Sequence, residues 1–267
     1  MTDPDLHAQI AAATAYETLH VPAIFAEWVE PVLDAARVES GQKVLDVACG
    51  TGLLARTASQ RVGPVGAVAG LDPSPGMLAV AEDINADVSW RRGTAESLPF
   101  AEASFDAVVS QFGLMFFVDR AQAIREMIRV LVPRGRLAVA VWDSLENSPA
   151  YSLEVDLLHR LVGQQAADAL RAPFVLGERA ELAALFERSG VASVEIATRT
   201  GTARFPSIRT MVEADLRGWL PVMGVELTED QIERVLREAE GVLSGFVESS
   251  GQVVFDSPAH IVTWRKP

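Results

Sequence analysis

Val44-Leu45-Asp46-Val47-Ala48-Cys49-Gly50-Thr51-Gly52 is the stretch that decides the fold of this chain. Four of its first five residues are apolar, which is typical of a short strand that is buried on both faces. Two glycines follow, and an apolar helical pattern begins at Leu53. A strand, a glycine turn and a helix N-terminus open a βαβ unit, whose turn can hold a ligand against exposed backbone N–H groups.

The glycine turn fits two different nucleotide cofactors. Residues 50–55 satisfy the dinucleotide pattern G-x-G-x-x-G/A, and Asp72 lies at about the distance expected of a ribose-binding acid. Asp46 distinguishes between the cofactors, because it precedes the turn at the carboxyl end of the strand. A carboxylate there would repel the pyrophosphate of NAD, whereas it suits a ligand with an amino group and a sulfonium. Electrostatics therefore favours S-adenosylmethionine over NAD.

Four further segments follow the glycine turn in an order that is characteristic of one family. They are residues 70–78, 93–100, 105–112 and 131–137. With the turn, they span roughly residues 43–142 and resemble the class I S-adenosylmethionine-dependent methyltransferases. Within that family the segments are similar to the small-molecule branch (methyltransferase type 11 like) that includes the ubiquinone and menaquinone biosynthesis methyltransferases.

Strands that alternate with helices predict right-handed βαβ crossovers and an α/β fold with a parallel sheet. The resemblance further implies a Rossmann-like seven-stranded sheet of order 3-2-1-4-5-7-6, with strand 7 antiparallel and helical cap insertions. The predicted strands are residues 44–48, 65–71, 88–92, 105–110, 136–142, 194–204 and 252–264. The predicted helices between them are 53–60, 74–84 (with Ser74 as its N-cap), 120–131 and 178–189.

The chain divides into a core and three helical additions. We expect two leader helices, broken around Val21-Pro22, and a capping box at Thr228 and Gln231 in the last insertion. The leader and both insertions are expected to pack together over the carboxyl edge of the sheet. The expected divisions are a leader at 1–40, a cofactor-binding core at 41–142, an insertion at 143–177, more core at 178–205, an insertion at 206–250 and a final strand at 251–267.

Composition excludes several classes of function. The 267 residues carry a formal net charge of −13, which disfavours nucleic acid as a partner because phosphate binding needs clustered Lys and Arg. No apolar run approaches the length of a membrane span, and residues 1–5 lack a signal-peptide profile. Cys49 is the only cysteine, consistent with a reducing compartment. These features predict a cytoplasmic protein and leave its oligomeric state open, while the resemblance implies a small-molecule acceptor.

The resemblance assigns the cofactor site to particular residues. Gly50 and Gly52 let the backbone approach the ligand, and Asp72 would accept hydrogen bonds from the ribose hydroxyls, although a helix-capping role would also suit this aspartate. Thr94 stands where the family usually has an acidic residue, so Glu96 is an alternative acceptor for the adenine amino group. The complete expected set is Tyr16, Asp46, Ala48, Gly50, Gly52, Asp72, Pro73, Met77, Thr94, Ala95, Glu96, Gln111 and Phe112.

The catalytic residues cannot be assigned from the sequence. No triad or metal-ligand spacing is present, and His20 is the best-placed candidate for a base, although a structural role would also suit it. Positioning alone can supply up to roughly 7–11 kcal/mol of barrier reduction. A cofactor-binding scaffold or sensor without turnover is the alternative function. The candidates for an apolar acceptor pocket are Phe112, Met115, Phe116, Trp219, Leu220 and Met223.

Overall fold

A seven-stranded sheet forms the centre of the computed structural model, which describes residues 4–267. The expectation of a missing signal peptide rests largely on residues 1–3, which lie outside that range. The strands are β1 (Lys43–Val47), β2 (Ala67–Asp72), β3 (Ser89–Arg92), β4 (Phe105–Gln111), β5 (Leu131–Trp142), β6 (Glu195–Phe205) and β7 (Val253–Arg265). Their order is β3-β2-β1-β4-β5-β7-β6, and β7 is antiparallel to both of its neighbours. The predicted fold class and strand order are confirmed.

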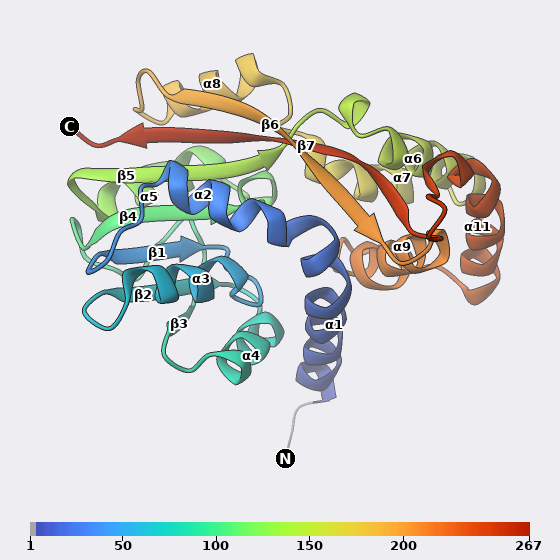
Figure 1. Ribbon diagram of the computed structural model, residues 1–267, viewed down its shortest axis with the longest axis horizontal. Helices are drawn as coiled ribbons and strands as arrows, with labels where there is room; N and C mark the ends of the chain where they lie inside the picture. The colour runs from blue at the N-terminus through green and yellow to red at the C-terminus, as the bar shows by residue number, and fades with distance from the viewer. Residues whose placement is uncertain (1–3) are drawn as a thin grey trace.

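Helices cover both faces of this sheet (Figure 1). The α-helices are α1 (Pro4–His20), α2 (Val29–Ala35), α3 (Leu53–Val62), α4 (Pro75–Ile84), α5 (Arg120–Val130), α6 (Pro149–Leu161), α7 (Gln164–Arg171), α8 (Arg179–Arg188), α9 (Ile208–Ala214), α10 (Leu220–Val222) and α11 (Glu229–Val242). α2 packs beside α3, and α5 packs beside α8. Both predicted caps are confirmed: Ser74 accepts the N–H of Met77, and Thr228 and Gln231 form a capping box.

Short helical turns connect these elements, and two of them lie in the leader. They are η1 (Val21–Phe25), η2 (Ala26–Trp28), η3 (Leu114–Phe116), η4 (Leu145–Asn147), η5 (Ala172–Phe174), η6 (Asp215–Trp219) and η7 (Ser244–Phe246). The predicted break around Val21-Pro22 is present: α1 ends at His20, and the π-helical turn η1 and the turn η2 separate it from α2. Pro22 is tolerated because it lies in the first turn of η1, where a missing N–H costs little. The leader therefore runs as a nearly continuous helical path.

The last two strands are longer than the sheet that they complete. β7 pairs with β5 only as far as Ala259, whereas its pairing with β6 continues to Val253. The unshared halves of β6 and β7 project as a two-stranded ribbon toward the helical insertions (Figure 1). Phe255 on this ribbon meets Tyr151 of α6, with ring centroids 5.5 Å apart. The ribbon thus carries the insertions.

The leader contacts both the core and the last insertion. α1 packs on α4, where Gly76 is required because a β-carbon there would lie 2.6 Å from the backbone of Gln9. α1 also contacts α9 and η6, while α6 of the first insertion contacts α11 of the second. No helix within residues 4–267 is both long enough and apolar enough to cross a membrane.

Candidate functional site

The two glycines of the turn after β1 serve different purposes. Gly50 and Gly52 both have left-handed backbones, with φ of +54° and +85°. A β-carbon on Gly50 would meet no atom within 4 Å, whereas one on Gly52 would collide with the ring of Trp90. Gly52 therefore makes room for the packing of the protein itself, and Gly50 faces open space beside the turn.

Trp90 is a structural wedge that the sequence analysis did not identify. Its ring also lies against Gly70, where a β-carbon would collide with it, and its Nε1 donates to Asn85 O at 2.8 Å. The indole thereby joins β3, β2 and the glycine turn. The signal in the sequence is faint, since it consists of two distant glycines and one tryptophan.

Asp72 holds the glycine turn in place from the end of β2. One carboxylate oxygen accepts the N–H of Gly50 at 2.9 Å, and the other accepts the N–H of Ser74 at 2.9 Å. Burial raises the pKa of Asp72, while these two backbone hydrogen bonds lower it. Each oxygen keeps a further lone pair, so the carboxylate retains capacity for a ligand.

Asp46 is the most unusual charged group near the turn. It is 1% exposed, and its Oδ2 has no hydrogen-bond partner among the described residues. Burial raises the pKa of Asp46 to about 8; a hydrogen bond from the backbone of Ala55 lowers it, and the nearby Asp72 carboxylate raises it. A buried carboxylate oxygen without a partner is costly, so this position favours a positively charged neighbour.

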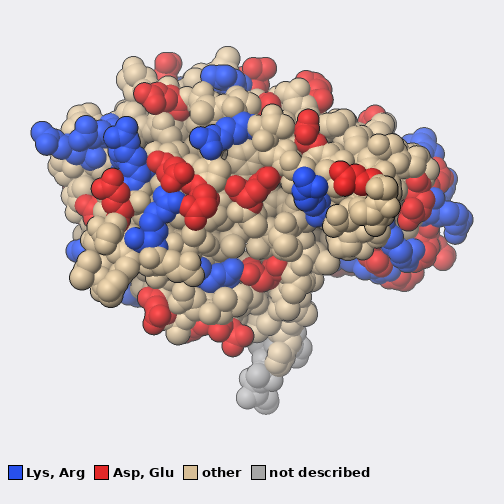
Figure 2. Space-filling model, viewed as in Figure 1, with Lys and Arg blue, Asp and Glu red and all other residues tan. Residues whose placement is uncertain are grey.

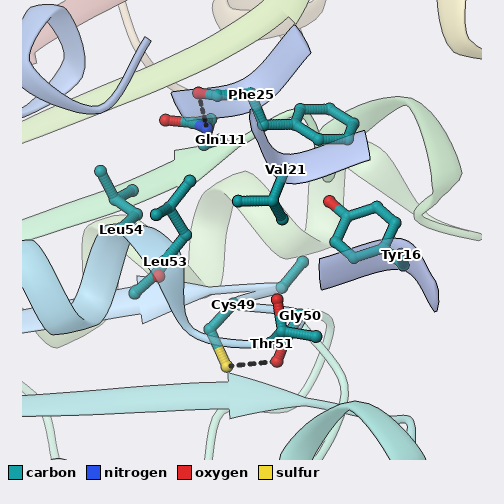
Figure 3. A pocket seen from close by; sticks show the side chains of 11 residues that line it. Tyr16, Val21, Phe25, Cys49, Gly50, Thr51, Leu53, Leu54 and Gln111 are labelled. Carbon is teal, nitrogen blue, oxygen red and sulfur yellow. Dashed lines mark hydrogen bonds between the residues drawn. The ribbon is translucent and has the colours of Figure 1, made fainter. Parts of the chain in front are cut away.

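A small cavity of about 40 Å³ lies between the leader and the glycine turn (Figure 3). The leader contributes Tyr16, Val21 and Phe25 to its wall, and Gln111 donates from Nε2 to Phe25 O at 3.1 Å. Such a volume holds a few water molecules at most. The remaining wall consists of Asp46, Ala48, Cys49, Gly50, Thr51, Leu53 and Leu54.

Polar contacts clamp the leader onto the glycine turn. Glu17 of α1 accepts a hydrogen bond from the Thr51 hydroxyl and forms an ion pair with Arg56 Nη2 at 2.6 Å. Arg56 Nη1 in turn donates to Thr51 O at 2.7 Å. The sequence analysis missed this clamp, because Glu17 lies 34 and 39 residues from its partners and no local pattern links them.

The segment expected on the adenine side lies outside the cavity. Ala95 is buried and Thr94 is exposed, while Glu96 Oε1 accepts the N–H of Val118 at 2.9 Å just before α5. Met77 is half-buried on α4, and the carbonyl of the exposed Pro73 accepts from Arg92. The structure thus brings Tyr16, Asp46, Ala48, Gly50 and Gln111 together around the cavity, with Asp72 bonded to Gly50 beside it.

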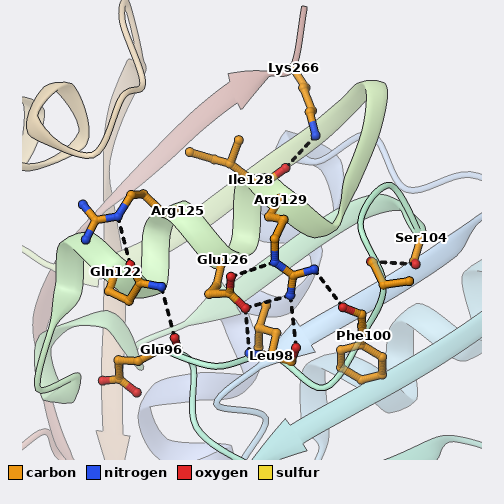
Figure 4. A network of polar contacts seen from close by, with 11 residues as sticks. Glu96, Leu98, Phe100, Ser104, Gln122, Arg125, Glu126, Ile128, Arg129 and Lys266 are labelled. Carbon is orange, nitrogen blue, oxygen red and sulfur yellow. Dashed lines mark hydrogen bonds and ion pairs between the residues drawn. The ribbon is translucent and has the colours of Figure 1, made fainter.

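A polar network fixes the loop that follows Glu96 (Figure 4). Arg129 of α5 donates to the carbonyls of Phe100 and Leu98, at 2.9 and 3.1 Å. Glu126 pairs with Arg129 at 2.7 Å and accepts the N–H of Leu98 at 2.9 Å. The hydrogen bond from Arg129 lowers the pKa of the Glu126 carboxyl. The loop is therefore held rigidly against α5.

His20 points to the last insertion rather than into the cavity. Its Nε2 lies 3.5 Å from Asp215 Oδ1, and its ring stacks on Tyr16 with centroids 5.7 Å apart. Asp215 is itself buried next to Glu154, and burial raises the pKa of both carboxyls. The histidine is therefore part of a buried polar cluster between leader and insertions.

The six candidates for an acceptor pocket fall into separate groups. Phe112 stacks face to face on Trp142, with ring centroids 3.7 Å apart, and Phe25 of the leader covers both. Phe116 instead meets Trp219, with centroids 5.1 Å apart. Met115 and Leu220 are buried, and Met223 packs against the core from a partly buried position. No group of three or more His, Cys, Asp or Glu that could hold a metal ion occurs in residues 4–267.

The amino-acid sequence of this chain is similar to the sequences of known methyltransferases. Residues 45–139 match the family model of a methyltransferase domain. The chain is 35% identical over 188 residues to the demethylmenaquinone methyltransferase of Staphylococcus carnosus, which covers 65% of this chain and 78% of that protein. It is 40% identical over 124 residues to the 2-phytyl-1,4-naphtoquinone methyltransferase of Thermosynechococcus vestitus, and this match covers 45% of this chain and 55% of that protein. The matched region thus spans only about half of the latter relative.

Solved structures share the fold at low sequence identity. A protein from an antibiotic biosynthesis pathway of Anabaena variabilis superposes with a TM-score of 0.67 and 19% identity, covering 91% of this chain and 98% of that one. The phosphoethanolamine N-methyltransferase 2 of Haemonchus contortus, in complex with phosphomonomethylethanolamine and S-adenosylhomocysteine, gives a TM-score of 0.60 at 16% identity, with 97% and 57% covered.

Proposed function

The chain belongs to the family of S-adenosylmethionine-dependent methyltransferases, and from this premise we propose that it transfers a methyl group from S-adenosylmethionine to a small apolar or aromatic acceptor. The observation that carries the proposal is the carboxylate of Asp46. Within residues 4–267, its Oδ2 is buried without a hydrogen-bond partner in the wall of the cavity beside Gly50. A cationic ligand would supply that partner and stabilise the ionised carboxylate, whereas a pyrophosphate would disfavour its ionisation.

The residues around the turn fit this cofactor. Asp46 would bind the amino group of the cofactor, and Asp72 would bind its ribose hydroxyl groups. The open space beside Gly50 would let the cofactor lie against the backbone of the turn. When bound, S-adenosylmethionine supplies an electrophilic methyl group on a sulfonium centre. Tyr16, Phe25 and Gln111 would border that end of the site, because they line the same cavity as Asp46.

The leader has to move before a ligand of that size can enter. The cavity of about 40 Å³ is far smaller than the roughly 300 Å³ at which ligand pockets begin. Tyr16, Val21 and Phe25 occupy the space over the turn, and the contacts of Glu17 with Thr51 and Arg56 hold them there. We infer that this clamp is the closed position of a lid and that its opening exposes the turn.

The acceptor is proposed to be apolar because the groups next to the cavity are apolar. Phe112, Trp142 and Phe25 form an aromatic layer that continues from the cavity wall. The relatives compared above are named as methyltransferases of naphthoquinone and menaquinone compounds, which have aromatic rings. His20 is engaged with Asp215, so positioning and exclusion of water are expected to provide most of the rate enhancement.

Calorimetry with S-adenosylhomocysteine tests the assignment of the site. Asp72→Ala removes charge-assisted hydrogen bonds and should cost about 1.5–3 kcal/mol of binding free energy. Asp46→Asn should weaken binding without creating affinity for NADH, while Asp83→Asn on the exposed side of α4 is the matched control. Unchanged affinity in Asp72→Ala, or NADH binding by Asp46→Asn, would contradict the proposal.

Transfer of a labelled methyl group tests the reaction separately from binding. We expect wild-type protein to move label from S-adenosylmethionine onto an apolar aromatic acceptor such as a demethylated naphthoquinone. Binding without any transfer, across a panel of such acceptors, would instead identify a cofactor-binding scaffold or sensor.

A further inference from the structure

A second hollow lies at the opposite edge of the sheet from the glycine turn. Its volume is about 320 Å³, which is within the range of small-molecule pockets. Gln42 precedes β1 and Asp106 lies near the start of β4, so the hollow is at the amino ends of these parallel strands. Its walls are Arg37, Glu39, Gln42, Asp106, Val132, Pro133, Arg134, Gly135, Arg136 and Arg265. We call this hollow the arginine groove.

The arginine groove is basic in a protein that is strongly acidic. Four arginines face two carboxylates, Glu39 and Asp106, although the whole chain carries a net charge of −13. Asp106 is already engaged, because it accepts the backbone N–H of Lys43 at 2.8 Å. Figure 2 shows basic side chains gathered at the end of the molecule where Figure 1 places the C-terminus.

The four arginines of the groove form no ion pair within the part of the chain that the structure describes. None of them has a carboxylate oxygen within 4.0 Å, which they share with exposed arginines such as Arg91 and Arg188, whereas Arg56 and Arg129 each have one. Arg136 and Arg265 are directly opposed cross-strand partners on β5 and β7. Like charges in that arrangement destabilise a sheet. Burial lowers the pKa of Arg136, and the Arg37 and Arg265 guanidiniums lower it further, while the carboxylates of Glu195 and Glu39 raise it by a smaller amount.

Two of these arginines also occupy unfavourable backbone conformations. Arg37 has φ of +49° and Arg134 has φ of +67°, in the left-handed region that favours glycine. Arg134 stands within the turn Pro133-Arg134-Gly135, where a glycine would relieve the backbone. Arg265 donates from Nε to Arg134 O at 3.3 Å and so joins the two strands of the groove. Strain and repulsion at one place are typical of a functional site.

We propose that the arginine groove binds a phosphate-bearing anion, either free diphosphate or the phosphate of a lipid headgroup. Guanidinium groups recognise phosphate oxygens through paired N–H donors, and four of them converge here from three separate segments of the chain. A bound anion would neutralise the opposed Arg136 and Arg265. Because the groove is at the other edge of the sheet, it would act independently of the cofactor site.

Titration calorimetry with sodium pyrophosphate tests whether the groove binds free diphosphate. We expect saturable binding that weakens as sodium chloride is raised from 50 to 300 mM, and at least a tenfold loss of affinity in Arg134→Gly. This variant removes a guanidinium while relieving a left-handed backbone, so loss of binding cannot be attributed to misfolding. The matched control is Arg234→Gln on α11, which removes an exposed arginine elsewhere and should bind within twofold of wild type.

Co-sedimentation with phosphatidylglycerol vesicles tests the lipid source. Binding to these vesicles but not to phosphatidylcholine vesicles, with loss in Arg134→Gly, would support the groove and identify a headgroup as its ligand. Saturable pyrophosphate binding without vesicle binding would support a free phosphorylated ligand. Absence of both, or equal binding by wild type and Arg134→Gly, would overturn the proposal.

Discussion

The two edges of the sheet carry charges of opposite sign. At the carboxyl edge, a cavity of about 40 Å³ is closed by the leader and is lined by Asp46, whose Oδ2 has no hydrogen-bond partner among the described residues. At the amino edge, a groove of about 320 Å³ contains four arginines that form no ion pair within residues 4–267. The first suits a cation and the second an anion, within one chain of net charge −13. Net charge therefore predicts little about an individual site, because local burial and neighbours decide which ion is favoured.

Left-handed backbone at residues other than glycine occurs at both edges. At the carboxyl edge Ala48 and Phe112 have φ of +61° and +57°, beside Gly50 and Gly52, which adopt such angles at low cost. At the amino edge Arg37 and Arg134 have φ of +49° and +67°. Both edges therefore hold backbone conformations that are costly for residues with a side chain.

The largest expected effect is on the pH dependence of stability at the carboxyl edge. The pKa of Asp46 is about 8 in the folded chain against 3.8 for an ordinary aspartate, so the folded state binds this proton more tightly. The resulting stabilisation is complete below about pH 4 and is lost as pH rises through 8. At about 1.4 kcal/mol per pKa unit, it amounts to at most about 6 kcal/mol.

Urea unfolding at pH 5 and pH 8 measures this effect. The ligand-free wild-type protein should be more stable at pH 5, and Asp46→Asn should lose much of that difference. Asp72, whose pKa is also raised by burial, titrates in both proteins, and its repulsion of Asp46 belongs to the measured difference because the two carboxylates interact. Identical pH dependence in wild type and variant would show that the Asp46 carboxylate is not isolated as described.

A smaller effect separates the two glycines of the turn. Gly52→Ala combines left-handed strain with a collision against Trp90 and should destabilise by about 3 kcal/mol. Gly50→Ala adds strain alone, because its β-carbon would meet nothing within 4 Å, and should cost about 1 kcal/mol. Denaturant midpoints of the two variants provide the measurement. If both lost the same stability, Trp90 would not be the wedge that the geometry indicates.

The smallest effect has the opposite sign and belongs to the amino edge. Arg134→Gly relieves the strain of a backbone with φ of +67° and removes one of the like charges, and both changes stabilise the folded state. Part of this gain is offset because glycine increases the conformational entropy of the unfolded chain. We expect a net stabilisation of about 0.5 kcal/mol in low salt without phosphate. Arg234→Gly, in the interior of α11, is the control and should destabilise by about 1 kcal/mol. Destabilisation by Arg134→Gly would mean that its guanidinium makes a favourable contact in the free protein.

The sequence by itself determined the features that few neighbouring residues encode. The glycine turn after β1, the Ser74 cap and the Thr228–Gln231 capping box are all local patterns, and the structure confirms them. The strand order followed from the resemblance of segments between residues 43 and 142, and it is confirmed too. The break predicted around Val21-Pro22 is also present, because α1 ends at His20 and α2 begins only at Val29.

Only the tertiary structure decided which distant residues meet. Glu17 reaches Thr51 and Arg56, Trp90 fills the space over Gly52, and the arginines of the groove come from three segments. His20, considered as a base, instead faces Asp215, 195 residues away. Such contacts depend on how whole elements dock, and side chains far apart in the chain leave no periodic or capping signal in the sequence. The physical reason is that local sequence patterns determine where each helix and strand begins and ends, whereas tertiary packing determines which helices and strands come into contact.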